Sequence, residues 1–223
     1  AHVTMAQRSP TMVLNVEPSA QLPYTLYSEG PPLEECDLLT AGMPFQVMRT
    51  SHRMLTERIR EIDRELLDGL ARIGFRTEFG WDESGWQFKY LENGGGYYFN
   101  VGCSDLLING QIGLVQFADI DGFVAEGARL ASGEVLPADL IVLATGYKGQ
   151  GQLVRRHFGE EVADRVGPVW GFDDDRHELR NMFVRTGQPG LWFIAGSFAQ
   201  CRIFSKYLGL QIKACEEGLC PLA

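Results

Sequence analysis

The chain has 223 residues, of which 45% are hydrophobic and 22% charged, the balance of an ordinary globular protein with a sizeable core. A net charge of −9 argues against a nucleic-acid partner, because no cationic excess exists to displace counterions from phosphates. The chain contains no apolar run of membrane-spanning length, and its five cysteines form no Cys-x-x-Cys pair. These features predict a cytoplasmic protein with reduced thiols and no membrane span.

Residues 2–7 alternate and are rich in strand-forming side chains, so they predict a strand that stops at Arg8-Ser9. The chain opens inside this strand without an initiator Met, and we therefore expect it to be a fragment of a longer protein. In a dinucleotide-binding domain, an acidic residue at such a strand end binds the ribose of NAD, whereas Arg accommodates the 2′-phosphate of NADP. Arg8 offers a planar fork to phosphate and Ser9 a second hydrogen bond. A solvated Arg at a strand end is the simpler alternative.

The next hundred residues carry elements to which we assign no catalytic role. Residues 17–48 are rich in Pro, Gly and acidic side chains, which predicts a long loop with a short helix near Cys36–Leu39. Apolar side chains at helical spacing predict an amphipathic helix from Thr50/Ser51 to Ile73. Aromatic side chains alternate through residues 75–100. They could line a substrate or nicotinamide pocket, but packing beneath a loop is the favoured interpretation.

The middle of the chain predicts strands. Leu106–Ile108 is a short strand or helix, and Ile112–Phe117 a strand after the Asn-Gly turn. Residues 121–139 form two alternating segments around Ser132-Gly133, which predicts a hairpin. The unbroken apolar run Leu140–Ala144 predicts a strand buried on both faces.

A hairpin, an Ala-Asp step and a buried strand ending in Ala144-Thr145-Gly146-Tyr147 resemble flavoproteins with two dinucleotide-binding domains. The ending looks most like the flavin-containing monooxygenase group, which includes N-hydroxylating and Baeyer–Villiger relatives. In that group this strand carries the chain from the NADPH domain back to the FAD domain. The resemblance also implies that a Gln-Arg-Ser strand end, here Arg8 and Ser9, binds NADPH.

The carboxyl-terminal part repeats the pattern of an apolar run followed by glycine. A polar helix is predicted over Leu153–Val166, a second buried strand over Leu191–Ala195, and an amphipathic helix over Cys201–Glu217. The resemblance implies that the bend between that strand and helix meets the flavin. The cofactor-binding candidates at the bend are Gly196, Ser197, Phe198 and Gln200.

The predicted fold class is α/β: an incomplete, Rossmann-like flavoprotein with two dinucleotide-binding domains and a β-hairpin crossover. No Gly-x-Gly-x-x-Gly in a strand–turn–helix context occurs in the chain, so both glycine fingerprint loops are missing. We assign residues 1–138 to a partial NADPH-binding domain with a helical and loop insertion. Residues 139–223 are assigned to the return strand and the carboxyl-terminal part of the FAD-binding domain.

The resemblance implies that the complete parent reduces FAD with NADPH, captures O₂ as a flavin hydroperoxide and oxygenates a small-molecule substrate. We identify no catalytic residue and no metal ligand in this chain, and we expect it to be inactive by itself and to favour self-association through open sheet edges. Two alternatives stay open: a non-catalytic remnant or interaction module, and a flavin-dependent reductase without a redox disulfide.

Overall fold

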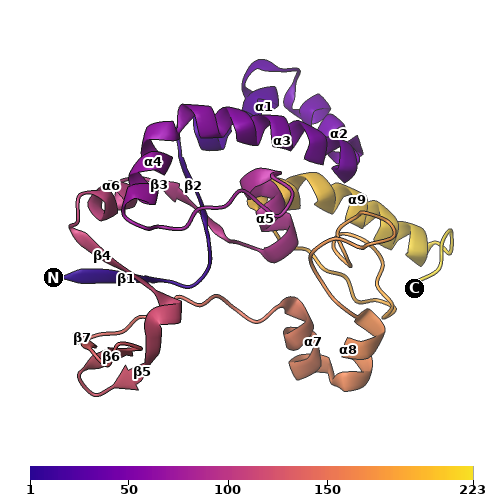
Figure 1. Ribbon diagram of the computed structural model, residues 1–223. Helices are drawn as coiled ribbons and strands as arrows, with labels where there is room; N and C mark the ends of the chain where they lie inside the picture. The colour runs from indigo at the N-terminus through magenta and orange to yellow at the C-terminus, as the bar shows by residue number, and fades with distance from the viewer. Residues whose placement is uncertain (223) are drawn as a thin grey trace. The chain divides into compact units, whose positions relative to one another are not determined.

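The computed structural model describes residues 1–222, which fold as two compact units (Figure 1). Helices account for 45% of the chain and strands for 14%, which confirms the α/β class. Unit 1 comprises residues 1–22, 53–86 and 96–146, and unit 2 comprises residues 23–52, 87–95 and 147–222. We predicted one division at residue 138, whereas the structure groups the insertion 23–52 with the carboxyl-terminal part, because Phe45 packs into that part's core.

Unit 1 is built on two parallel strand pairs. The strand β1 (Val3–Gln7) pairs with β4 (Ile112–Gln116), and β2 (Met12–Asn15) pairs with β3 (Tyr97–Asn100). The predictions of a strand at the start of the chain and of another after the Asn-Gly turn are confirmed. In both pairs the register brings the last residues of the two strands side by side, Gln7 beside Gln116 and Asn15 beside Asn100.

Helices α4 (Arg64–Arg72) and α6 (Cys103–Ile108) pack in the same unit, so the Leu106–Ile108 stretch is helical. The single helix predicted over residues 50–73 is interrupted. It forms α3 (Phe45–Ile62) and then α4, and Asp63, the residue between them, binds Asn15 through its carboxylate. Two apolar clusters fill unit 1. Their buried members are Met12, Leu14, Ala20, Ile59 and Trp86 in one, and Val13, Leu66, Leu70, Phe75 and Leu107 in the other.

The predicted hairpin is confirmed as part of a three-stranded antiparallel sheet of β5 (Ile120–Val124), β6 (Gly127–Leu130) and β7 (Val135–Pro137). A short 3₁₀ turn, Phe117–Asp119, leads into it from β4. Beyond β7 the prediction of a core strand over Leu140–Ala144 is wrong: the run is extended, exposed and unpaired (Figure 1). Within residues 1–222 no strand lies beside it to accept its backbone hydrogen bonds.

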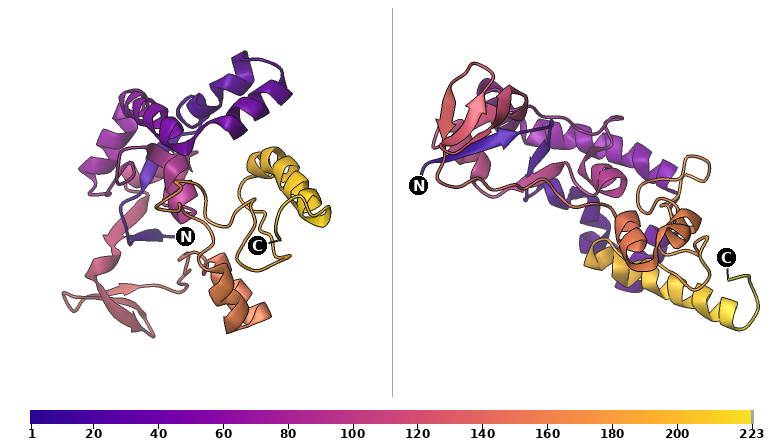
Figure 2. Two further views of the ribbon diagram at one scale, coloured as in Figure 1. Left: turned by 90° about the vertical axis from the view of Figure 1, so that its right-hand side faces the viewer. Right: turned by 90° about the horizontal axis from the view of Figure 1, so that it is seen from below.

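Unit 2 is mainly helical (Figure 2). Its cluster of buried side chains includes Leu91, Val154, Leu179 and Leu208. The short helix expected near Cys36 is found as part of a longer one. The predicted helix over residues 153–166 is divided at Gly159, whose φ of +87° belongs to the left-handed region. The helices are α1 (Thr25–Glu29) after a 3₁₀ turn at Ser19–Tyr24, α2 (Leu33–Gly42), α5 (Gly85–Asn93), α7 (Gln150–Phe158), α8 (Glu160–Val166) and α9 (Phe198–Glu216).

The second predicted core strand, Leu191–Ala195, is also wrong as a strand, since the run joins no sheet. It nevertheless packs against the core of unit 2, and its Phe193 carbonyl accepts a hydrogen bond from the Phe183 N–H at 3.0 Å. The helix predicted from Cys201 is confirmed as α9. Within residues 1–222, no helix combines the length and apolar character that crossing a bilayer requires.

Candidate functional site

The carboxyl end of β1 is held by a buried glutamine. Gln7 donates through Nε2 to the Arg76 carbonyl at 2.8 Å and accepts from the Arg76 N–H at 2.9 Å. Its partner across the strand pair, Gln116, donates to Gln7 Oε1 and to the Gly74 carbonyl, each at 3.2 Å. Because the bonds between Gln7 and Arg76 join residues about seventy positions apart in sequence, they fix the loop after α4 against the end of the strand.

This arrangement brings two arginines together at the strand end. The Arg76 guanidinium donates through Nη2 to the Arg8 carbonyl at 2.9 Å, and Arg8 itself is exposed. Among the side chains that the structure describes, no carboxylate forms an ion pair with either arginine. Ser9 is also exposed and lies directly after Arg8. Arg8, Ser9 and Arg76 thus supply two guanidinium groups and one hydroxyl to the residues around this strand end, and groups of this kind can bind a phosphate dianion.

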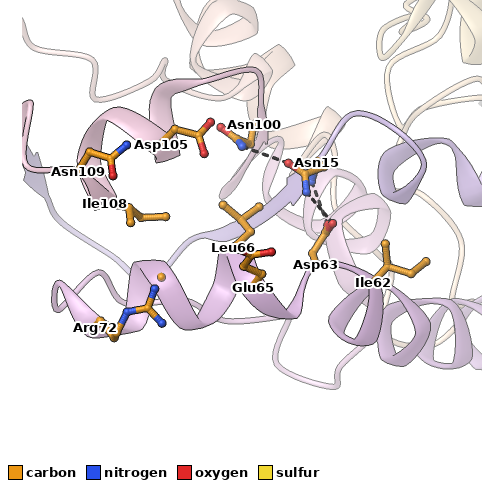
Figure 3. A pocket seen from close by; sticks show the side chains of 11 residues that line it. Asn15, Ile62, Asp63, Glu65, Leu66, Arg72, Asn100, Asp105, Ile108 and Asn109 are labelled. Atoms are coloured by element: carbon orange, nitrogen blue, oxygen red, sulfur yellow. Dashed lines mark hydrogen bonds between the residues drawn. The ribbon is translucent and has the colours of Figure 1, made fainter.

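A polar pocket of about 460 Å³ opens at the carboxyl ends of β2 and β3 (Figure 3). Its floor is a chain of hydrogen bonds: Asp63 accepts from the Asn15 N–H at 3.0 Å and from Asn15 Nδ2 at 2.8 Å, and Asn100 Nδ2 donates to Asn15 Oδ1 at 3.1 Å. Asn100 Oδ1 in turn accepts from the Gly102 and Ser104 N–H groups at the start of α6. Ligands of open α/β sheets bind outside the carboxyl ends of the strands, which is where this pocket lies.

The rim of the pocket carries both signs of charge. Glu65 and Arg72 reach it from α4, and Asp105 and Asn109 from α6 and its end. These groups, together with the Asn15 and Asn100 amides, can bind a small ligand rich in hydroxyl or amino groups. Asp63 is 2% exposed, and both of its oxygens are occupied by Asn15, so it positions the floor and is not itself a free base.

Unit 2 contains an apolar groove of about 380 Å³ between α2, α9 and the loop at residues 178–184. Gln211 spans its wall, donating through Nε2 to the Phe183 carbonyl at 2.9 Å and the Tyr207 carbonyl at 3.3 Å. Glu178 lies at the edge of the groove, and desolvation raises the pKa of its carboxyl group. The apolar lining consists of Leu38, Ala41, Phe45, Leu179, Met182, Phe183, Val184 and Phe204. Such a groove suits a small apolar molecule.

The predicted bend at Gly196 forms a capping box at the start of α9. Gln200 N–H donates to Ser197 Oγ at 3.2 Å, and Ser197 N–H donates to Gln200 Oε1 at 3.1 Å. Within residues 1–222, the N–H groups of Phe198 and Ala199 have no acceptor, and the Phe198 side chain is 97% exposed. The bend therefore offers two backbone donors and an exposed ring to a ligand.

The other predicted site, Ala144-Thr145-Gly146-Tyr147, is exposed and belongs to no helix or strand. We predicted that Gly146 and Gly196 would each stand at the edge of a cleft. Neither glycine lines the polar pocket or the apolar groove. The reason is that both glycines come after runs that do not enter a sheet, and a cleft at a strand end requires the sheet.

The predicted site residues are divided between the two units. Arg8 and Ser9 lie in unit 1 with Ala144, Thr145 and Gly146, whereas Tyr147 and the four residues at the α9 bend lie in unit 2. Residues 1–222 contain no group of three or more His, Cys, Asp or Glu side chains placed to hold a metal ion.

Sequence reasoning missed Arg76, which is far from Arg8 along the chain, and the residues of both concavities. The one local signal for Arg76 was the helix end at Gly74, after which a returning chain passes the strand end. No protein-family model matches the chain, and no curated protein sequence matches it significantly.

Proposed function

We propose that this chain is the carboxyl-terminal part of a flavin-containing monooxygenase-like oxidoreductase that uses NADPH and FAD. The observation that carries the proposal is the pair of guanidinium groups without a carboxylate partner, Arg8 and Arg76, at the carboxyl end of the parallel strand β1. In a dinucleotide-binding domain this is where the 2′-phosphate of NADP binds. A carboxylate there would instead favour NAD, and the strand end Gln7-Arg8-Ser9 has none.

The rest of the assignment rests on the resemblance and the order of elements. The order of elements along the chain is the one expected for two Rossmann-like dinucleotide-binding domains joined by a β-hairpin crossover. The parallel strand pairs come first, then the hairpin sheet, then the apolar run Leu140–Ala144. The bend Gly196–Gln200 would meet the flavin through the Phe198 and Ala199 N–H groups. When bound, the nicotinamide supplies a hydride and the flavin supplies oxygen-transfer chemistry to a small-molecule substrate.

Each residue of the phosphate site has a distinct role in this proposal. Arg8 binds the phosphate through its planar guanidinium, and Ser9 donates a further hydrogen bond. Arg76 adds the second positive charge, and its orientation depends on Gln7, which holds its backbone N–H and carbonyl. Gln7 is a positioning residue, since its side chain is buried and already bonded.

The test compares adenosine 2′,5′-bisphosphate with adenosine 5′-monophosphate by NMR titration of the chain, a method that detects millimolar affinities. We expect the bisphosphate to bind more tightly. Arg8→Ala should weaken it by about 1.5–3 kcal/mol, roughly tenfold to a hundredfold, because a charge-assisted phosphate contact is lost. The dissociation constant of the monophosphate should change by less than about twofold in the same variant. Arg64→Ala, which removes an equal charge from the exposed side of α4, serves as the matched control.

Equal losses for both nucleotides in Arg8→Ala, or no preference for the bisphosphate in the wild type, would contradict the proposal. A non-catalytic module predicts no such preference, so the same titration separates it from the oxidoreductase.

The chain contains no glycine fingerprint for a pyrophosphate. We therefore expect it to be colourless, to lose FAD on gel filtration and to leave NADPH unconsumed. A yellow preparation at near-stoichiometric flavin would show that the chain is wrongly positioned within the family.

A further inference from the structure

Two cysteines at the end of α9 lie in direct contact. The Sγ atoms of Cys215 and Cys220 are 3.3 Å apart, and both residues are thiols. Cys36 is different: its buried Sγ donates to the carbonyls of Leu26 and Pro31. Within residues 1–222, Cys215 and Cys220 are the one cysteine pair with such a contact.

A Schellman motif brings the two sulfurs together. The Leu219 N–H donates to the Ala214 carbonyl at 2.9 Å, and the Gly218 N–H donates to the Cys215 carbonyl at 3.1 Å. Gly218 has a φ of +71°, in the left-handed region that favours glycine. The chain therefore reverses at Gly218, and Cys220 returns alongside the last turn of the helix.

The residue after the pair is also fixed. The Pro221 carbonyl accepts from Arg185 Nη1 at 2.9 Å and from the Cys215 thiol at 3.2 Å. Cys215 is buried and Cys220 is partly exposed. Burial raises the pKa of the Cys215 thiol, so the more accessible Cys220 is the thiol that reacts first with an external oxidant.

We propose that Cys215 and Cys220 form a reversible intramolecular disulfide, a redox modification site that closes the end of α9. With glutathione disulfide as oxidant, the Cys220 thiolate attacks one of its sulfurs, forms a mixed disulfide and releases one glutathione thiolate. Cys215 then loses its proton to solvent and attacks the Cys220 sulfur, and the second glutathione leaves as a thiolate. The two protein thiols lose two protons and two electrons, and glutathione disulfide takes up both electrons to become two glutathiones.

The test is a titration of the full chain in glutathione redox buffers, quenched with acid and analysed by peptide mass spectrometry without reduction. We expect a Cys215–Cys220 loop peptide that is two hydrogens lighter than the reduced peptide. Its equilibrium constant in native buffer should exceed that in concentrated guanidinium chloride by about tenfold or more. A short flexible segment gives an effective concentration only in the millimolar range, and the folded turn should raise it.

Variants separate the folded turn from simple closeness in sequence. Cys215→Ser should trap glutathione on Cys220, and Cys201→Ser, the matched control, should leave loop formation unchanged. In Gly218→Ala the added Cβ meets no atom within 4 Å, so the substitution changes only the preference for the left-handed turn. It should lower the equilibrium constant for disulfide formation in native buffer by roughly fivefold or more. Equal constants in native and denaturing buffer, or glutathione remaining on Cys220 of the wild type without loop formation, would overturn the proposal.

Discussion

Two apolar runs of five residues, each with a glycine close behind it, adopt different environments in this molecule. Leu140–Ala144 leads to Gly146 and is exposed, with Leu140 at 79% and Leu143 at 70% exposure. Leu191–Ala195 leads to Gly196 and packs against the core of unit 2. The second run is held by specific bonds: besides the bond between Phe183 and Phe193, Thr186 Oγ1 donates to the Leu191 carbonyl at 2.8 Å.

The difference shows that apolar composition specifies a need for burial but not the surface that provides it. Neither run has a neighbouring strand within the described residues, so neither becomes a strand. The second run is partly buried because the loop at residues 179–186 and helix α9 supply apolar side chains around it. A strand is a property of a sheet and not of one segment, and the pairs formed with neighbouring strands stabilise it.

The largest expected difference between the runs is in proteolysis. Chymotrypsin should cut the native chain within residues 140–147 at least about a hundredfold faster than within 191–195, because the second run must first open locally at a cost of about 3 kcal/mol. Timed digestion with mass spectrometry measures both rates. Comparable rates at the two runs would mean that the packing of the second run is not maintained.

Unit 2 also contains a buried titratable side chain, His52. Burial lowers the pKa of His52 from 6.5 to about 4, and its ring meets Phe88 nearly edge-on at 5.3 Å between centroids. Below about pH 6.5 His52 is protonated in the unfolded chain, whereas in the folded chain it stays neutral down to about pH 4. The free energy of unfolding should therefore fall by about 3 kcal/mol as the pH is lowered from 6.5 to 4.

Urea denaturation at several pH values between these limits measures the effect. His52→Gln should flatten the pH dependence, and His157→Gln, at an exposed position, should not. An unchanged slope in His52→Gln would argue against a neutral buried imidazole.

Matched leucines in the two runs provide a smaller effect but a direct comparison. Leu191→Ala should lower the free energy of unfolding by about 1–3 kcal/mol, below the full cost for a buried leucine because Leu191 is partly exposed. Leu143→Ala should change it by no more than about 0.5 kcal/mol. Equilibrium urea unfolding distinguishes the two, and a larger loss for Leu143→Ala would show that its run is buried in solution.

The smallest effect concerns the hydroxyl residue beside each glycine. Ser197→Ala removes one half of the capping box next to Gly196 and should cost about 1 kcal/mol. Thr145→Ala, next to Gly146, removes an exposed side chain and should cost less than about 0.5 kcal/mol. Thermal unfolding of the two variants measures the difference. Equal melting temperatures would mean that the Ser197 cap does not stabilise the fold.

Local signals predicted much of the fold. Alternation identified β1, the Asn-Gly turn preceded β4, the Ser132-Gly133 turn marked the hairpin, and helical spacing identified α9. These elements depend on residues close together in sequence, and their side-chain pattern was sufficient.

Contacts between distant residues could not be predicted from the sequence. The Asp63 carboxylate, between α3 and α4, is bound by Asn15, and the position of Arg76 depends on Gln7. Arg8 was a candidate from its strand end alone, whereas its companion arginine, the polar pocket and the apolar groove all require the folded chain. The two apolar runs were misassigned for the same reason, since the missing information concerned their neighbours.

The bond between Asn15 and Asp63 has a consequence for how the chain tolerates insertions. It joins the two residues that flank the segment 16–62, so this segment forms a loop that is closed next to the strand pair β2–β3. Loop-closure entropy grows only logarithmically, by about 0.6 kcal/mol for each doubling in length. Residues added at the exposed, glycine- and proline-rich stretch Gly30–Pro32 should therefore cost the sheet little while the Asn15–Asp63 closure is kept.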